Sequence, residues 1–212
     1  MAHYHPSDDL LMRFSAGQLA NALGIMVACH LTRCEQCSHH TNWYERLGGD
    51  LLNECDGVTV EPDTLSNLLK KLNEPEIPSE PKQCVDARIP KPLQRFVPGY
   101  YEQLPWSGMV PGVREYVLPF SDTIYTAKFY KISAGKELPE HTHRGSEYTL
   151  VMEGSFADKS GRYQEGDFIL ADTQTIHQPT AAMERDCICF AVMDAPIKMT
   201  GFFGRMLNPF IR

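Results

Sequence analysis

The spacing of apolar residues predicts helices over roughly the first 73 positions. Residues 7–9 (Ser-Asp-Asp) are a helix-start signal before LLMRFSAG, and Gly17 interrupts the pattern. Apolar residues then recur at helical spacing through QLANALGIMVACHLT, at Leu19, Leu23, Met26, Val27 and Leu31. The segment SHHTNWYERLGG predicts a helix that ends at Gly48 and Gly49. A last helix, LSNLLKKL, opens at Pro62-Asp63-Thr64.

A proline-rich stretch follows the helical pattern. Six prolines lie close together, at Pro75, Pro78, Pro81, Pro90, Pro92 and Pro98. This density argues against a helix and predicts an extended linker.

The remaining chain has the alternating pattern of β-strands. Its short apolar or alternating runs are VREYVLPF, TIYTAKFYKI, SEYTLVMEGSF, GDFILAD and CICFAVMD. Turns with glycine or aspartate separate them, at the spacing typical of a barrel or a sandwich. The sequence therefore predicts a multidomain α + β protein, with a small helical domain over 1–74, a linker over 75–98 and a β domain over 99–212.

Composition narrows the classes of partner and compartment. The formal net charge is −7, so the chain lacks the basic footprint of a protein that binds nucleic acid directly. No apolar run approaches the about 18 residues of a membrane-spanning helix, and the polar start does not resemble a signal peptide. We therefore expect a cytoplasmic protein without a membrane partner. Seven cysteines, an odd number, argue against a fully paired disulfide framework and favour metal binding.

The stretch HLTRCEQC holds the first candidate metal site. His30, Cys34 and Cys37 stand at offsets of zero, four and seven, which places them on one face of a helix and lets them converge even across a turn. Structural zinc takes four ligands in a tetrahedron, drawn from cysteine thiolates and histidine nitrogens. Three of the four are present in this stretch.

The fourth ligand has several candidates: His3, His5, His39, His40, Cys29 and Cys55. His39 and His40 follow Cys37 so closely that they point largely away from the site. His5 lies just before the first helix, which can fold back beside the second, so we favour His5 and then His3. The alternatives are a C-x-x-C redox pair, for which no thioredoxin-like βαβ setting is visible, and three unrelated side chains.

A second candidate site lies in the β region. His141 and His143 alternate on a strand, so both project to the same face, and Glu147 follows after a short turn. With His177 from farther along the chain, they would form a mononuclear metal site with open positions. Mixed nitrogen and oxygen ligands suit Fe, Mn, Ni or Zn, and the residue types do not choose among them. The alternative is a set of surface histidines.

Cys187 and Cys189 face the same side of a predicted strand. Their Cα atoms would lie roughly 6.5–7 Å apart, at the upper limit for an unstrained disulfide. One interpretation of this spacing is a redox sensor; the favoured interpretation is two buried, small apolar residues.

The second site resembles the cupin family, whose first motif is G-x5-H-x-H-x3,4-E-x6-G. Every spacing is met, by Gly135, His141, His143, Glu147 and Gly154. In the second motif, G-x5-P-x-G-x2-H-x3-N, Gly166 and His177 are in place. Asp172, Gln174 and Ala181 replace the usual proline, glycine and asparagine, which affects turns rather than ligands. The resemblance implies a cupin β-barrel of the jelly-roll type that binds a metal.

The helical half resembles the zinc-binding anti-sigma domain, whose mark is H-x3-C-x2-C. In that family an upstream histidine commonly completes the site, which supports His5. The two halves together resemble the anti-sigma factors that hold an extracytoplasmic-function sigma factor inactive until oxidative stress, notably singlet oxygen, arises. The resemblance implies a regulator rather than an enzyme: the helical domain binds the sigma factor, and the cupin senses or transmits the signal for release.

The charge of the helical half is compatible with this partner. Residues 1–72 contain nine acids and five bases, a difference of −4, which favours a partner with basic DNA-binding surfaces. One alternative is a metal-dependent, dioxygenase-like cupin enzyme with an accessory zinc domain. Another is a zinc-finger-like DNA-binding regulator, against which the acidic helical half argues.

Overall fold

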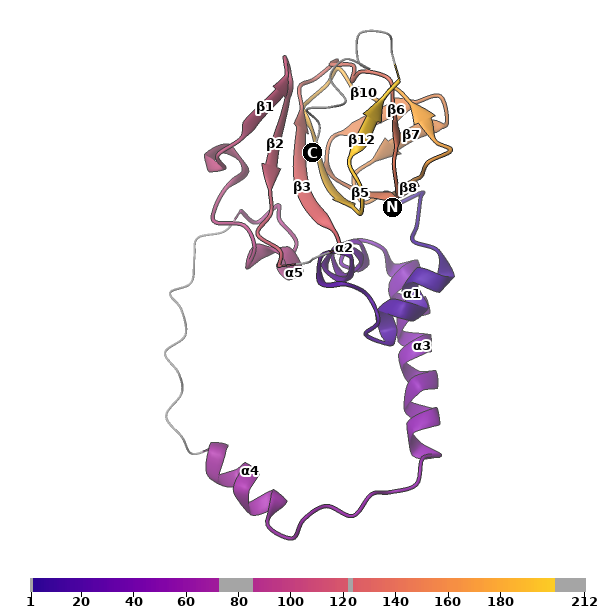
Figure 1. Ribbon diagram of the computed structural model, residues 1–212, viewed down its shortest axis with the longest axis vertical. Helices are drawn as coiled ribbons and strands as arrows, with labels where there is room; N and C mark the ends of the chain where they lie inside the picture. Colours follow the sequence, from indigo (N-terminus) through magenta and orange to yellow (C-terminus); the bar gives the residue numbers. More distant parts are fainter. Residues whose placement is uncertain (1, 73–85, 122–123, 201–212) are drawn as a thin grey trace.

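The computed structural model describes residues 2–72, 86–121 and 124–200. Helices gather at one end of a mostly β structure, and α3 projects away from it (Figure 1). The described helices are α1 (Asp8–Ser15), α2 (Asn21–Leu31), α3 (Glu35–Asn53), α4 (Thr64–Leu72), α5 (Lys91–Gln94) and the 3-10 turn η1 (Tyr101–Gln103). None of these helices has the length and the apolar character needed to cross a membrane.

The described part of residues 99–200, here called the β domain, is built from short antiparallel strands. These are β1 (Ser107–Val110), β2 (Val113–Val117), β3 (Thr126–Ile132), β4 (His141–His143), β5 (Glu147–Glu153), β6 (Ser155–Asp158), β7 (Gly161–Gln164), β8 (Phe168–Ala171), β9 (Ile176–His177), β10 (Thr180–Ala181), β11 (Cys187–Met193) and β12 (Ile197–Met199). They form a six-stranded sheet in the order β1-β2-β3-β11-β5-β8 and two three-stranded sheets, β10-β6-β7 and β12-β4-β9.

The five β runs predicted from the sequence all contain strands, and one of them is divided. SEYTLVMEGSF forms β5 and β6, which meet at Gly154. Gly154 has a φ of 74°, and a Cβ there would lie 2.5 Å from the carbonyl oxygen of Asp186. Only glycine tolerates that conformation and that close approach, which explains the glycine at the end of the first histidine motif.

Helix α2 joins the helical region to the β domain. Six of its residues are buried, and the helix has no fully exposed apolar face. The buried residues are Ala22, Leu23, Met26, Val27, Cys29 and His30. A helix that is apolar all round must be covered on every side. It packs against α1, α3, α5, β5 and β11, so that one continuous hydrophobic core runs from Leu11 in α1 to Phe190 in β11.

The predicted linker over residues 75–98 differs between its two parts. Residues 73–85 lie outside the described residues. Residues 86–98 are folded, and they contribute three apolar side chains to the shared core: Ile89, Leu93 and Val97. Helix α5 forms in this part because Pro92 occupies its first turn, where no intrahelical N–H is required. The expectation of an extended linker is therefore corrected for residues 86–98.

The other predicted helices form, with one change of length. The Ser7 hydroxyl accepts a hydrogen bond from the Leu10 N–H at 3.3 Å, and Gly17 has a φ of 66°, so α1 begins and ends as its pattern predicts. Helix α3 continues through Gly48 and Gly49 to Asn53, beyond its predicted end. Neither glycine takes a positive φ. A helical glycine costs about 1 kcal/mol relative to alanine, which weakens the helix but does not end it.

Two candidate metal centres

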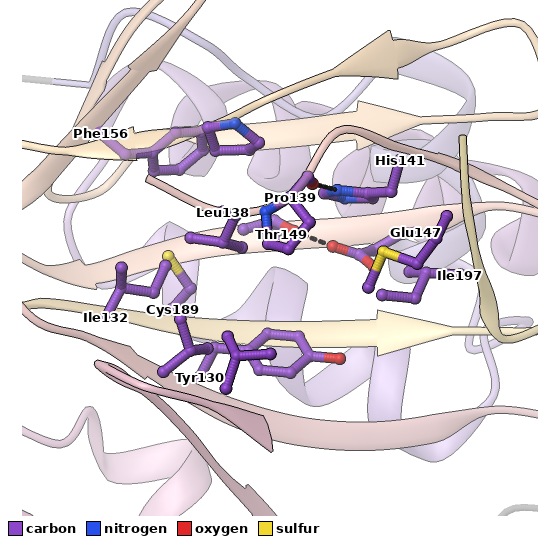
Figure 2. A pocket seen from close by; sticks show the side chains of 14 residues that line it. Tyr130, Ile132, Leu138, Pro139, His141, Glu147, Thr149, Phe156, Cys189 and Ile197 are labelled. Carbon is purple, nitrogen blue, oxygen red and sulfur yellow. Dashed lines mark hydrogen bonds between the residues drawn. The ribbon is translucent and has the colours of Figure 1, made fainter. Parts of the chain in front are cut away.

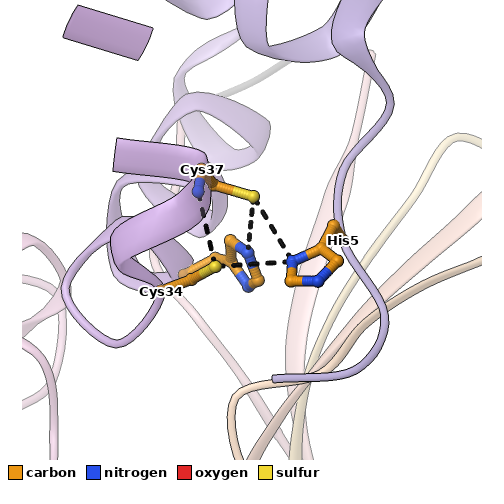
Figure 3. A group of neighbouring side chains, drawn as sticks. His5, Cys34 and Cys37 are labelled. Atoms are coloured by element: carbon orange, nitrogen blue, oxygen red, sulfur yellow. Dashed lines mark hydrogen bonds between the residues drawn. The ribbon is translucent and has the colours of Figure 1, made fainter. Parts of the chain in front are cut away.

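The first candidate centre brings together His5, His30, Cys34 and Cys37. Each offers one ligand atom, and these four atoms all lie within 4.8 Å of one another. The His30 Nε2 atom is 3.3 Å from Cys37 Sγ, and His5 Nδ1 is 3.4 Å from both Cys34 Sγ and Cys37 Sγ. Nitrogen and sulfur ligands on one tetrahedral zinc ion are separated by about 3.5 Å. The four side chains therefore fit a tetrahedral metal of zinc type (Figure 3).

Local structure explains why three of these ligands converge. His30 lies in the last turn of α2, Cys34 is the N-cap of α3 and Cys37 lies in the first turn of α3. The Cys37 N–H points at Cys34 Sγ, at 3.5 Å. A turn at residues 32–33 separates the two helices, so the ligands come from two helix ends rather than from one continuous face.

Burial disfavours charged forms of the side chains at this centre. Burial raises the pKa of the Cys37 thiol to about 12 and lowers the pKa of His30, so these two side chains are neutral at physiological pH without a metal. A metal ion supplies the positive charge that holds buried thiols as thiolates.

The remaining candidates for the fourth ligand lie elsewhere. His3, His39 and Cys55 are exposed, and His40 faces the carboxylate of Asp8 at 3.4 Å. Cys29 is buried in the shared core, and burial raises its pKa to about 12. Among the described residues, none of these five belongs to the first group of converging ligand atoms.

The second candidate centre is formed by three histidines of the β domain. His141 pairs with His177 across β4 and β9, and His143 lies two residues along β4. The Nε2 atom of His177 is 3.0 Å from that of His141 and 3.2 Å from that of His143. Burial lowers the pKa of His141 to about 4 and that of His143 to about 3, so both are neutral and able to coordinate a metal.

The other ring nitrogen of each histidine faces an oxygen atom. Nδ1 of His141 is 2.8 Å from the carbonyl oxygen of Pro139, and Nδ1 of His177 is 3.0 Å from Asp158 Oδ2. Nδ1 of His143 is 3.6 Å from Glu147 Oε2. The hydrogen bonds at Nδ1 of His141 and His177 leave the Nε2 lone pair of each ring free to coordinate, which is the usual arrangement behind a metal ligand.

Glu147 lies beside the three histidines but is not one of the converging group. Its side chain is 12% exposed, and its Oε1 accepts a hydrogen bond from the Thr149 hydroxyl at 3.1 Å. Burial raises the pKa of Glu147 to about 7. Direct coordination by Glu147 therefore stays a prediction.

Asp158 is a site residue that the sequence did not point to. Its side chain is 4% exposed, and it starts the turn between β6 and β7. In sequence it is an ordinary turn aspartate, whose Oδ1 accepts hydrogen bonds from the backbone N–H groups of Ser160 and Gly161. Only the fold brings its second oxygen to His177.

A small apolar cavity adjoins the second centre. It has a volume of about 80 Å³, with His141 and Glu147 in its wall (Figure 2). The rest of the wall is mostly apolar, with Ile132, Leu138, Phe156, Cys189 and Ile197 among its residues.

Cys187 and Cys189 lie in the same region. Their Sγ atoms are 3.7 Å apart, both thiols are free, and both side chains are buried as expected.

Large apolar side chains are exposed on the outer half of α3 and on α4. They include Trp43, Leu47, Leu51, Leu52, Leu65, Leu68 and Leu72. None of the side chains of α4 is buried, and Figure 1 shows this helix apart from the other described elements. Clusters of exposed apolar side chains of this kind mark interaction sites.

Known proteins resemble this chain over both halves. Residues 98–195 match a family model described as the ChrR Cupin-like domain. The anti-sigma-E factor ChrR of Cereibacter sphaeroides is 34% identical over 209 residues, which cover 99% of this chain and 98% of that protein. In the crystal structure of Rhodobacter sphaeroides SigE in complex with the anti-sigma ChrR, one chain is similar with a TM-score of 0.81 and 34% identity. That match covers 92% of this chain and 100% of the other.

Proposed function

Because this chain belongs to the family of the anti-sigma factor ChrR, we propose that it binds an extracytoplasmic-function sigma factor and keeps it from RNA polymerase. The observation that carries this proposal is the exposed leucine-rich surface of α3 and α4. The full-length relationship to a regulator also favours this function over that of a cupin enzyme. The cytoplasm, where a sigma factor meets RNA polymerase, is the compartment we propose.

Helix α4 has the properties of a segment that is completed by a partner. It has only nine residues, and isolated helices of that length are marginal in water. Leu65, Leu68 and Leu72 stand at i, i+3 and i+7, which places them on one stripe of the helix. A groove between sigma-factor helices would bury this stripe, as in other helix-in-groove complexes.

Charge favours the same type of partner. The helical half carries a difference of −4 between bases and acids, and sigma factors use basic surfaces to contact promoter DNA. An acidic helical domain laid over such a surface would mask it. The bound helical domain would then compete with promoter DNA and RNA polymerase simply by occupying the same surface of the sigma factor.

The first centre is proposed as a structural zinc site with His5, His30, Cys34 and Cys37 as ligands. Zinc would fasten the N-terminal segment and α2 to the first turn of α3. This attachment fixes the direction in which α3 projects, and therefore the position of its exposed apolar side chains. The geometric fit of the two thiols and two imidazoles supports the assignment.

The second centre is proposed as the metal site of a cupin barrel that mediates release. His141, His143 and His177 would hold the metal, with Glu147 as a further ligand, and zinc, iron, manganese or nickel would each suit this set. The apolar cavity beside it would admit a small apolar oxidant such as singlet oxygen to His141 and Glu147. Release under oxidative stress would then begin in the β domain and end at the sigma-binding helices.

Co-expression tests the proposal directly. The full chain is produced together with the extracytoplasmic-function sigma factor encoded beside its gene. A soluble complex that inhibits transcription from the sigma-dependent promoter is expected. Absence of a complex with any sigma factor, combined with turnover of an organic substrate, would refute the anti-sigma assignment.

A further inference from the structure

The N-terminal segment before α1 lies along the β domain. We call residues 2–5, which end at the metal-site histidine His5, the strap. The backbone N–H of Phe168 donates to the carbonyl oxygen of Tyr4 at 3.0 Å. The N–H groups of His3 and Tyr4 donate to Asp167 Oδ1 at 2.6 and 3.2 Å. The strap is therefore attached to the β domain through backbone groups of two consecutive residues.

Asp167 is placed to receive the strap. It lies in the turn between β7 and β8 and is fully buried. Its second oxygen, Oδ2, accepts a hydrogen bond from the N–H of Gln164 at 2.8 Å. One carboxylate thus closes its own turn and binds the strap, so the position of the strap depends on the conformation of this turn.

Side-chain packing reinforces the attachment. The ring of Tyr4 lies against that of Tyr163 in β7, with centroids 4.7 Å apart. A Cβ at Gly161 would lie 2.5 Å from the Tyr4 hydroxyl, so the tyrosine is seated closely on the β6–β7 hairpin. His5 is the next residue, and its ring therefore enters the first centre from a fixed starting point.

The same turn also holds a second ligand of the first centre. Nδ1 of His30 is 2.8 Å from the carbonyl oxygen of Gly166, and the His30 ring packs edge-on against Phe168, with centroids 5.9 Å apart. A hydrogen bond from Nδ1–H to this carbonyl leaves the Nε2 lone pair facing Cys37. All four ligands belong to the helical half, but the atoms that orient two of them belong to the β domain.

We propose that the turn Gln164–Phe168 of the β domain positions His5 and His30, with Asp167 as the positioning residue, so that metal affinity at the first centre depends on the β domain. This inference rests on the proposed metal site of the helical half. Metal binding in the helical half would then depend on the β domain, which is the part proposed to receive the signal.

The strands on either side of the turn lead to the second centre. Strand β8 pairs with β5, where Ala171 stands opposite Glu147. Strand β7 pairs with β6, which ends at Asp158, the hydrogen-bond partner of His177. A change at the second centre that shifts either strand would move the turn, withdraw His5 and His30 and loosen the first centre. The sigma-binding helices would then lose their fixed arrangement.

Cobalt substitution in the full chain tests the inference. Thiolate-to-cobalt charge-transfer absorbance arises only where Cys34 and Cys37 bind the metal, so it reports on the first centre while the second contributes none. The test variants are Asp167→Ala, which removes the strap acceptor, and Tyr4→Ala, which removes the ring packing. Asp186→Ala is the matched control, because it removes a β-domain carboxylate that accepts the Ala134 N–H at 3.0 Å, away from the strap.

We expect Asp167→Ala and Tyr4→Ala to weaken cobalt and zinc binding at the first centre by about 10-fold or more, as outer-shell substitutions commonly do. Their charge-transfer bands should also change shape. Tyr4→Phe, which keeps the ring, should restore the wild-type affinity and spectrum, and Asp186→Ala should not differ from wild type.

Wild-type affinity and spectrum in both test variants would overturn the inference. If Asp167→Ala does not fold, Tyr4→Ala decides alone, because Tyr4 is 37% exposed and belongs to neither hydrophobic core cluster. Replacing both cysteines distinguishes failure of the metal site from failure of the positioning role. A charge-transfer band that survives in the double variant Cys34→Ser/Cys37→Ser would refute the metal site itself, whereas its loss there and a wild-type band in the test variants would refute only the positioning role.

Discussion

Removing two leucines from the outer stripe of α4 should abolish most sigma-factor binding without destabilising the protein. The double variant is Leu65→Ala/Leu68→Ala. Neither leucine is buried in the free chain, and alanine has the higher helix propensity, so the free energy of unfolding should stay within about 0.5 kcal/mol of wild type.

The size of the effect follows from exposure. Leu65 is 65% exposed and Leu68 is 57% exposed, so a partner that covers them removes more than half of each side chain from water. Truncating a fully buried leucine to alanine loses about three methylene equivalents at about 0.8 kcal/mol each. Scaled by the exposed fractions, the double substitution should cost about 3 kcal/mol of binding free energy, or about 100-fold in Kd.

Titration calorimetry of the full chain with its sigma factor measures this Kd, and chemical denaturation of the free chain measures stability. Asn67→Ala is the matched control, because residue 67 lies on the opposite side of α4 and is exposed. A Kd unchanged in the double variant would refute the role of α4. An equal loss of affinity in Asn67→Ala would show that the effect is not specific to the leucine stripe.

Three further predictions address the metal centres and the core. Cys34→Ser should remove the metal of the first centre and sigma-factor binding together. His141→Ala should leave sigma-factor binding intact and abolish release under oxidative stress. Sigma-factor binding at wild-type affinity in Cys34→Ser would show that the metal does not organise the interface. Met26→Ala should cost about 2–5 kcal/mol and destabilise helices and β domain in one denaturation transition, and two separate transitions would contradict the shared core. In chelated protein, burial raises the pKa of Glu147 from 4.5 to about 7, so stability should fall by up to about 3 kcal/mol relative to Glu147→Gln as pH rises from about 5 to about 8. Parallel stability profiles of the two proteins would refute the burial effect.

Much of the secondary structure could be predicted from local patterns in the sequence. The Ser7 cap, the break at Gly17 and the five β runs depend on neighbouring residues, and each appears where its pattern places it. His30, Cys34 and Cys37 converge for the same reason, since a turn between two helix ends keeps them close. Spacing alone could not establish that His5 joins them, because its position depends on a turn more than 150 residues away in the sequence.

Long-range packing explains what the sequence did not predict. The apolar pattern of α2 indicates a buried helix, but it does not say that the β domain covers it. Prolines suggested a linker over residues 86–98, yet three apolar side chains there complete the shared core. Asp158 and Asp167 look like ordinary turn residues, because their second carboxylate contacts come from distant segments.

Hydrogen exchange of the full chain, free and bound to its sigma factor, tests whether α3 and α4 hold the sigma factor. On binding, amide protection should rise over residues 43–53 of α3 and over α4, while the β strands keep their free-state exchange. Protection confined to the β domain, or unchanged exchange in both helices despite complex formation, would contradict the claim that these helices hold the sigma factor.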